Sequence, residues 1–248
     1  MASLAALALP LAKVGEVGEG FFKERTSDTL PCQAGDALFC FDWARENIGE
    51  YATPAVQHVE LVAISVLVGF VIAFALALLA HRRRWLKAPL LGATGVLYTV
   101  PSIAFFFLLL PITGFGRDSA IIALSAYTLQ IIYRNTIVGL ANVPPSVKDA
   151  ARGMGLTDRQ ILWRVEVPLA TPEIVAGLRI ATVSTVALAT LATFIGAGGL
   201  GKPIYEFINF KTNIIIAGGL AILIALAFDA ILFGVQRLAT PWRRVATG

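Results

Sequence analysis

The chain has 248 residues, of which 57% are hydrophobic and only 15% are charged. Soluble domains carry roughly 25% charged residues, so the composition excludes an ordinary soluble protein and indicates an integral membrane protein. The net charge of +4 does not point to nucleic acid, because the basic residues stand at the ends of apolar runs, where membrane topology explains them. We therefore expect no nucleic-acid partner.

The first 58 residues form a segment that the charge distribution described below places outside the cell. Residues 1–12 are apolar but too short to span a bilayer, and they lack the basic start of a signal peptide. Cys32 and Cys40 lie in this segment with seven residues between them, which favours a structural disulfide on an oxidising face. Two unpaired thiols are the alternative, and a metal site would need more ligands than His58 could add.

An interfacial helix is predicted from about residue 42 to residue 51, ahead of the first membrane span. The aromatic residues Phe39, Phe41, Trp43 and Tyr51 cluster here, as a belt at the membrane surface would. Pro54 follows the cluster and is expected to separate this helix from the span.

Five apolar runs of about twenty residues predict five transmembrane helices, because a run of this length crosses the bilayer and satisfies its own backbone. The runs are residues 59–80, 90–113, 119–141, 172–195 and 213–238. The predicted fold class is an all-α polytopic membrane protein, with a transmembrane domain at residues 59–240 and a tail at residues 241–248. Pro101 lies in the second run and is expected to kink its helix and free local carbonyl groups.

Basic residues divide unevenly between the two sides of the membrane. Ten lie in the loops after spans one and three and in the tail, namely Arg82, Arg83, Arg84, Lys87, Lys148, Arg152, Arg159, Arg164, Arg243 and Arg244. Three, Arg117, Lys202 and Lys211, lie in the loops on the other side. Because loops rich in lysine and arginine stay in the cytoplasm, we expect the N-terminus outside and the C-terminus inside a bacterial cell membrane.

The loop between spans three and four turns polar and contains a spaced motif. It reads Asp149-Ala150-Ala151, three residues, Gly155, nine residues, and then Val165-x-Val167-Pro168. Ser146 is expected to cap a short helix, with Asp149 completing an approximate capping box, and Gly155 is expected to end that helix. Ala150 and Ala151 are expected to give the helix a small, close-packing face.

The second half of this loop, residues 157–167, is predicted to begin with Thr157 as its cap. Arg159, Arg164 and Glu166 are expected to point outward, and Pro168 to fix the entry of the chain into the fourth span. The whole loop is predicted to be a docking surface for a soluble partner. An amphipathic loop that only shields the helix bundle is the alternative.

The motif resembles the EAA loop of ABC importer permeases, in which Glu-Ala-Ala, three residues, Gly and nine residues precede Ile-x-Leu-Pro. Asp149 replaces the glutamate, and valines replace the isoleucine and leucine. Over residues 55–240, four segments resemble the glycine betaine, carnitine and choline branch of these permeases: Arg134-Asn135-Thr136, Ala150-Ala151-Arg152-Gly153-Met154-Gly155, Leu178-Arg179-Ile180-Ala181-Thr182 and residues 193–201. That branch shares the five-helix core of methionine-importer permeases.

The resemblance implies the permease subunit of an ATP-driven importer for quaternary-amine osmoprotectants. The residues that would couple it to two cytoplasmic ATP-binding subunits are Ser146, Asp149, Ala150, Ala151, Arg152, Gly153, Met154, Gly155 and Pro168. When those subunits close on ATP-Mg, the loop helix would move as a lever. A second permease chain, identical or paralogous, and an extracytoplasmic substrate-binding protein would complete the assembly in the lipid bilayer. The alternatives are a permease for another small solute, such as methionine or a sulfonate, and a membrane scaffold without transport activity.

No catalytic or nucleotide-binding motif is found in the sequence, so the chain is expected to bind no cofactor and not to be an enzyme. His58 and His81, the two histidines, flank the first span and are expected to be ordinary interfacial residues. Gly196-x-Gly198-x-x-Gly201 spells the dinucleotide fingerprint, but it follows a membrane span rather than a strand. We expect these glycines to turn an outer loop sharply and to pack against a neighbouring helix.

Charged and aromatic side chains within the spans are candidates for a polar network and a transport path. Arg134 and Asp229 lie at similar depths and are predicted to pair or to share one network. The alternative is that each side chain reaches the inner surface independently. Because aromatic faces attract quaternary ammonium ions, the pathway candidates are Tyr98, Phe105, Tyr127 and Tyr133, with Pro101 beside them. Ordinary packing is the alternative for each aromatic residue.

Overall fold

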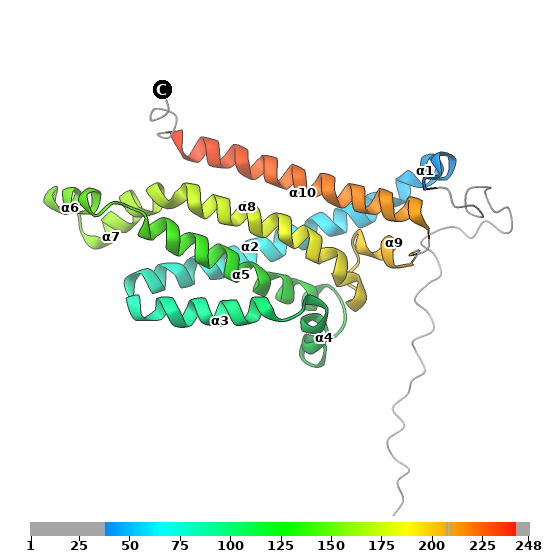
Figure 1. Cartoon of the computed structure of the whole chain (residues 1–248), viewed down its shortest axis with the longest axis horizontal. Coiled ribbons are helices and arrows are strands. Elements are labelled where there is room, and N and C mark those ends of the chain that lie inside the picture. The colour runs from blue at the N-terminus through cyan, green and yellow to red at the C-terminus, as the bar shows by residue number, and fades with distance from the viewer. Residues whose placement is uncertain (1–37, 207, 209, 242–248) are drawn as a thin grey trace, which may run out of the picture.

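Helices make up the regular structure of the part of the chain that the computed structural model describes, residues 38–206, 208 and 210–241. Four long helices run side by side along the molecule: α2 (Ala52–Arg82), α5 (Arg117–Ala141), α8 (Val167–Leu191) and α10 (Lys211–Ala239) (Figure 1). Each is long and apolar enough to cross a membrane. A fifth crossing is available from the bent pair α3 (Lys87–Thr99) and α4 (Ser102–Thr113). The prediction of an all-α polytopic membrane protein is therefore confirmed.

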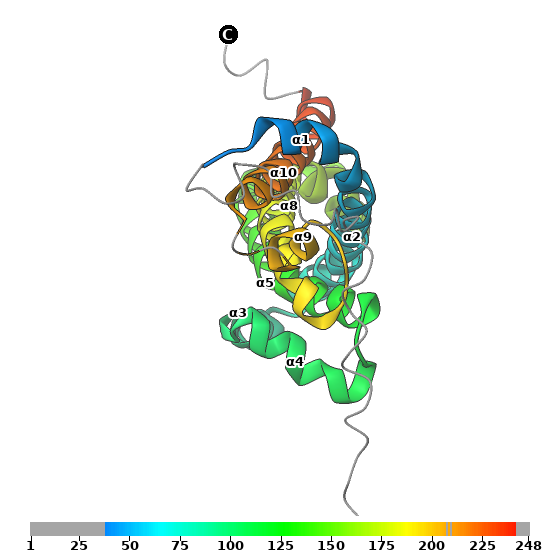
Figure 2. The same cartoon turned by 90° about the vertical axis from the view of Figure 1, so that its right-hand side faces the viewer.

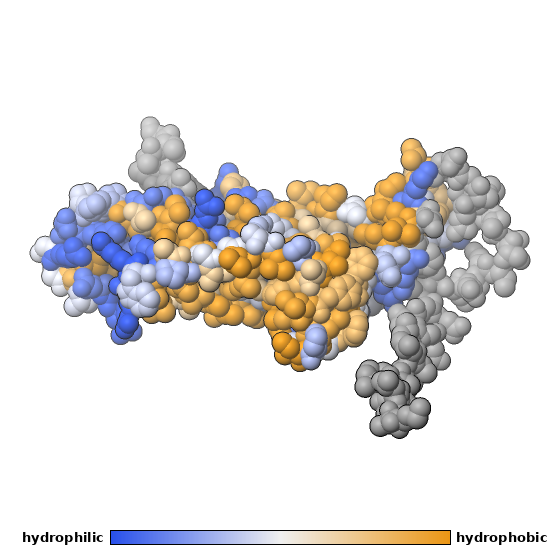
Figure 3. Space-filling view, turned by 60° about the horizontal axis from the view of Figure 1, so that its bottom comes forward, coloured by the Kyte–Doolittle hydropathy of each residue, from blue (hydrophilic) through white to orange (hydrophobic). Residues whose placement is uncertain are grey.

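The hydropathy of the surface follows this arrangement. A broad apolar band covers the middle of the molecule, and hydrophilic residues gather over the end that carries α6 (Pro145–Gly153) and α7 (Asp158–Ile161) (Figures 1 and 3). Seen from the opposite end, α5 lies between the other long helices and the α3–α4 pair (Figure 2). The helix α5 packs against α2, α8, α3 and α4, so it is the central helix of the bundle.

The first span is longer than the sequence predicts. Two short helices, α1 (Phe41–Asn47) and η1 (Ile48–Tyr51), occupy the predicted interfacial segment, and α2 follows directly at Ala52. Pro54 does not separate the two parts, because it lies in the first turn of α2, where proline removes no helical hydrogen bond. Tyr51 is not a surface residue either, since it is buried and its hydroxyl donates to Asn213 Oδ1 on α10.

The second predicted span is not a straight helix. The chain bends by 99° between the helices α3 and α4. Val100 and Pro101 both have extended ψ angles, 129° and 130°, as expected because a proline disfavours the helical conformation of the residue before it. The Tyr127 hydroxyl donates to the carbonyl of Val100 that the bend leaves without a helical partner. The predicted kink at Pro101 is thus present, and it is a full break.

The fourth span also begins earlier than predicted. The helices α7, η3 (Leu162–Glu166) and α8 follow one another without a gap. The segment η3 is a π turn, in which the Val167 N–H bonds to the Leu162 carbonyl five residues earlier. Pro168 therefore does not mark the start of a helix. The wider π turn directly before it accommodates a residue that has no N–H and would crowd the carbonyl four positions earlier in a regular helix.

The long helices come into close contact at two glycines, one on α2 and one on α8. A Cβ added at Gly69 on α2 would lie 1.7 Å from Thr128 Oγ1 on α5, and one added at Gly177 on α8 would lie 2.5 Å from the Asn135 Cβ on α5. Small residues at such crossings are typical of membrane helix packing, because association in lipid depends on close contact. These two glycines fix how tightly α2 and α8 pack on α5.

Candidate functional site

The helix α6 begins two residues earlier than the sequence predicts, since a cap at Ser146 would make Val147 its first residue. Pro145 is its first residue, Pro144 occupies the cap position, and no side chain caps the helix. Proline suits this first position because its fixed φ matches the helix and its missing N–H needs no partner. The prediction that Ser146 caps the helix in a box with Asp149 is therefore wrong, and Ser146 is an exposed residue of the first turn.

The end of α6 has the predicted glycine. Gly155 has a φ of +82°, in the left-handed region that favours glycine. The Leu156 N–H bonds to the Ala151 carbonyl at 3.2 Å, and the Gly155 N–H bonds to the Arg152 carbonyl at 2.9 Å. These two bonds form a Schellman motif, which satisfies the last carbonyls of the helix and reverses the chain.

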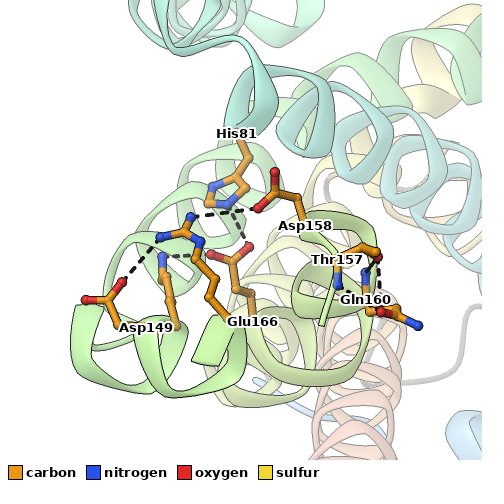
Figure 4. Close-up of polar contacts among 8 residues, drawn as sticks. His81, Asp149, Thr157, Asp158, Gln160 and Glu166 are labelled. Atoms are coloured by element: carbon orange, nitrogen blue, oxygen red, sulfur yellow. Dashed lines mark hydrogen bonds and ion pairs between the residues drawn. The ribbon is translucent and has the colours of Figure 1, made fainter. Parts of the chain in front are cut away.

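Thr157 caps α7, as predicted. The Gln160 N–H donates to Thr157 Oγ1 at 3.4 Å, and the Thr157 N–H donates to Gln160 Oε1 at 2.8 Å (Figure 4). This reciprocal pair is a capping box, which satisfies two backbone donors at the start of the helix. The turn from α6 to α7 is thus specified at both of its ends.

Glu166 lies inward, at the junction of three elements. Lys148 Nζ on α6 lies 2.7 Å from Glu166 Oε1, and His81 Nε2 at the end of α2 lies 2.9 Å from Glu166 Oε2 (Figure 4). Only 7% of Glu166 is exposed. The prediction that Glu166 points outward is wrong, and His81 is a partner in this contact rather than an ordinary interfacial residue.

We refer to Glu166, Lys148 and His81 as the Glu166 cluster. It joins α6 to α2 and to the π turn that begins α8. Separating the two charges of such a buried ion pair costs free energy, because each charge would remain buried without its partner. The Glu166 cluster therefore holds α6 in a defined position relative to two of the long helices.

The two alanines of the motif face different ways. Ala151 is 1% exposed, whereas Ala150 is exposed, as expected because consecutive helix residues point about 100° apart. The prediction that both alanines form one close-packing face is therefore wrong. The outward face of α6 has an apolar row of Val147, Ala150 and Met154, of which Met154 is 73% exposed. These positions share a face because they are three or four residues apart.

Charged side chains border this apolar row. Arg152 Nη1 lies 3.3 Å from Asp149 Oδ1, and Arg152 Nη2 lies 3.8 Å from Asp158 Oδ1 (Figure 4). All three side chains are well exposed, so these ion pairs contribute little to stability. The same charges remain available to a partner, and together with Val147, Ala150 and Met154 they form what we call the α6 surface.

Residues 65–245 match the family model of the binding-protein-dependent transport system inner membrane component. The chain belongs to this family. It is a transport permease and not an enzyme. As a member of this family, the permease works in a membrane with ATP-hydrolysing and substrate-binding partner proteins.

Three relatives illustrate the similarity. The osmoprotectant import permease protein OsmW of Salmonella typhimurium is 39% identical over 79% of this chain and 94% of its own length. The carnitine transport permease protein OpuCB of Listeria monocytogenes is 34% identical over 83% of this chain and 94% of its length. The choline transport system permease protein OpuBB of Bacillus subtilis is 33% identical over 79% and 91%.

Solved structures support the fold. A permease chain of the MetNI methionine ABC transporter, in an inward-facing conformation, superposes with a TM-score of 0.63 at 24% identity, covering 75% of this chain and 95% of that one. A chain of an amino acid ABC transporter with histidines gives the same TM-score of 0.63 at 19% identity, covering 80% and 98%. At these identities the likeness concerns the fold alone.

The intramembrane charges of the permease pair differently from the prediction. Arg179 on α8 binds Asp229 on α10 through two contacts, Nε to Oδ1 at 2.8 Å and Nη2 to Oδ2 at 2.7 Å. The predicted pairing of Arg134 with Asp229 is wrong, because α10 packs against α8 and Arg134 is exposed on α5. Arg179 was not among the predicted site residues, although an arginine inside the apolar run 172–195 is a visible signal in the sequence.

Three of the four aromatic pathway candidates gather at the α3–α4 break, close to Pro101. The ring of Tyr127 lies 5.7 Å from that of Phe105 and 6.0 Å from that of Tyr98, edge to face in both pairs. Tyr133 does not join them, because its buried hydroxyl donates to the Lys87 carbonyl at 3.1 Å. The role of these rings in a pathway remains a prediction.

His58 lies inside the bundle, whereas the sequence predicts it at the membrane surface. Its Nε2 lies 3.1 Å from the Val186 carbonyl, and its Nδ1 lies 3.4 Å from the Leu200 N–H. Gly198 and Gly199 next to this contact have φ values of +77° and +80°, and a Cβ at Gly199 would lie 3.0 Å from His58 Nδ1. The predicted sharp, closely packed glycine loop is therefore confirmed.

The structure describes only Cys40 of the two cysteines that the sequence predicts to form a disulfide. Cys40 is disulfide-bonded and buried, and its N–H donates to Thr212 Oγ1 at the start of α10 at 2.9 Å. Cys32 lies outside the described residues, as do Arg243 and Arg244 of the tail.

Proposed function

We propose that this permease is one of two membrane chains in an ATP-driven importer for quaternary-amine osmoprotectants of the glycine betaine, choline and carnitine class. The named relatives carry osmoprotectants, choline or carnitine. The alignment covers 91–94% of their lengths, which supports a common task for the whole domain. The second permease chain is either identical to this one or a paralogue.

The α6 surface is the observation that carries the coupling part of this proposal. It presents an exposed apolar row with both signs of charge beside it, a composition that suits a protein interface. In this proposal the α6–α7 end lies in the cytoplasm, consistent with the basic residues in this region, and each of two ATP-binding subunits receives one α6 surface. ATP-Mg is used by those subunits.

The Glu166 cluster explains how movement of α6 reaches the spans. Because Glu166 connects α6 with α2 and α8, a shift of α6 during closure of the ATP-binding subunits moves the ends of both helices with it. The permease in this account changes shape and does no chemistry. An extracytoplasmic binding protein delivers the solute to the opposite end, beside α9 (Gly201–Glu206).

The test is ATP-dependent uptake by proteoliposomes that contain the permease, its ATP-binding subunits and its binding protein. We expect accumulation of glycine betaine, choline or carnitine, and no accumulation of methionine or taurine. Uptake of methionine alone would replace the proposed solute class. Failure of the permease to assemble with an ATP-binding subunit would refute the coupling role.

A further inference from the structure

The Arg179–Asp229 pair is held in place from one side only. Three residues of α10 contact the Arg179 guanidinium: Asp229 through two hydrogen bonds, Gln236 Oε1 at 3.3 Å, and the Phe233 ring, whose centre lies 4.9 Å from Cζ. Gln236 in turn donates to the Pro172 carbonyl on α8 at 2.9 Å. The pair is therefore a built, oriented site and not two mobile surface side chains.

This pair lies at the middle of the apolar region. Arg179 is twelve residues from each end of α8, which runs from Val167 to Leu191. At 1.5 Å per residue this places it about 18 Å from either end of the helix. A bilayer has a hydrocarbon core of about 30 Å, so the pair is far from both membrane surfaces.

The pair is nevertheless partly uncovered. The side chain of Arg179 is 26% exposed and that of Asp229 is 34% exposed. Both line a pocket of about 420 Å³, together with Ala176, Ile180, Val183 and Ser184. Charged side chains that face lipid at the bilayer centre cost about 2.5–3.5 kcal/mol each on insertion scales, and they almost always face a protein interior or a water-filled cavity. This chain alone does not enclose the pair, so water or a second chain must cover it.

Arg179 has hydrogen-bonding capacity to spare on this open side. The guanidinium has five N–H groups, of which two bind Asp229 and one binds Gln236. The remaining two N–H groups have no acceptor among the described residues. A carboxylate is the acceptor that an arginine fork fits best.

We propose that the α8–α10 face around Arg179 and Asp229 lines a water-filled translocation pathway between two permease chains, where Arg179 binds the carboxylate of zwitterionic quaternary amines. Asp229 offsets the charge of Arg179 and lies next to the position of the solute's trimethylammonium group. The carboxylate part of this inference rests on the proposed function, whereas the aqueous exposure of the face does not.

The first experiment measures whether the face is in contact with water. Single variants Ile180→Cys and Ser184→Cys in the assembled transporter are treated with a charged methanethiosulfonate reagent, with the unsubstituted chain as blank. Ile231→Cys is the matched control, because Ile231 is 63% exposed against 55% for Ile180 and lies about 160° from Asp229 around the axis of α10. We expect residues 180 and 184 to react at least about tenfold faster than residue 231, the contrast between an aqueous and a lipid environment.

Equal, slow reaction at residues 180, 184 and 231 would show that lipid or a dry contact covers this face, and would overturn the inference. This outcome does not depend on which solute the transporter carries. A transporter that labels as expected but moves no quaternary amine would refute the proposed function and leave the aqueous pathway standing.

The second experiment tests the carboxylate. The double variant R179Q/D229N removes both charges and keeps two neutral side chains that can hydrogen-bond, with the side chain at position 179 shorter by two atoms. We expect the ratio of glycine betaine uptake to choline uptake to fall about tenfold, the scale of losing a hydrogen bond to a charged group, because choline has no carboxylate. The ratio compares two solutes in one preparation, so poorer folding does not change it. An unchanged ratio would overturn the role of Arg179 in carboxylate binding.

Discussion

Glu166 and Lys148 form an ion pair of 2.7 Å that joins the π turn before α8 to α6. The two side chains are 9% and 21% exposed, so removal of one partner leaves a largely buried charge. Truncating one partner of a buried pair costs about 3–5 kcal/mol when the remaining charge is fully buried, and His81 still faces Glu166 here, so we expect Lys148→Met to cost less than that. The measurement is thermal unfolding of the purified transporter.

Coupling provides a second readout for Lys148→Met. We expect more ATP to be hydrolysed for each solute imported, because α6 is no longer fixed to the spans. Arg152→Met is the control for stability, since Arg152 makes only exposed ion pairs and should leave the unfolding temperature nearly unchanged. If Lys148→Met changes neither stability nor the coupling ratio, the Glu166 cluster does not transmit movement.

Two glycines two residues apart in the α6 turn should respond in opposite ways to alanine. Gly155 has a φ of +82°, whereas Gly153 lies in the helix and has open space around its Cβ position. Alanine at position 155 places a side chain in the left-handed region and should cost about 1–2 kcal/mol. Alanine at position 153 should be neutral or stabilising by about 0.5–1 kcal/mol. Unfolding curves of the two variants test this, and equal effects would contradict the Schellman turn.

Met154 on the α6 surface should matter for assembly and not for folding. It is 73% exposed, so Met154→Asp should leave the unfolding temperature of the permease unchanged while weakening co-purification of the ATP-binding subunits. Leu238→Asp is a matched control, because Leu238 is 79% exposed near the end of α10. Equal loss of the ATP-binding subunits in both variants would mean that the α6 surface has no special role. Ala151 is unsuitable for this test, because a bulky residue there would disturb the permease itself.

Gly177 on α8 should be more sensitive to alanine than Gly218 on α10. An added Cβ would lie 2.5 Å from the Cβ of Asn135, and overpacking of this kind costs about 1–3 kcal/mol. A Cβ added at Gly218 on α10 would meet no atom within 4 Å, so Gly218→Ala should cause no loss of stability. The test is the yield of folded, monodisperse protein together with its unfolding temperature. A Gly177→Ala variant as stable as Gly218→Ala would show that α5 and α8 are not tightly packed at this point.

The sequence alone predicts the membrane helices and the coupling loop, because both depend on local patterns. Run length predicts the spans, and the Asp149–Gly155 spacing is the basis on which the loop is predicted to be a coupling loop. The boundaries were less accurate where a polar residue lies inside the bundle. The sequence places Tyr51 at the membrane surface as part of an aromatic cluster, and His58 there as a histidine that flanks the first span. In the structure Val186, Leu200 and Asn213 supply hydrogen-bonding partners for them in the interior.

The ionic contacts could not be predicted in the same way. Lys148 and Glu166 belong to different helices, and their contact depends on the turn at Gly155 and on the extra residue of the π turn. Similar depth suggested Arg134 as the partner of Asp229, but depth along the membrane normal does not say which helices are neighbours. The packing of α10 on α8 decides that Arg179 is the partner.

The π turn at Leu162–Glu166 has a geometric effect on everything that precedes it. This turn contains one residue more than an α-helix needs to cover the same path, so the α6–α7 hairpin keeps the orientation that a regular helix one residue shorter would give it. Removing one amino acid from Leu162–Glu166 should therefore leave the α6 surface facing the same way, whereas removing one from the regular part of α8 would swing the whole hairpin by about 100° around the helix axis.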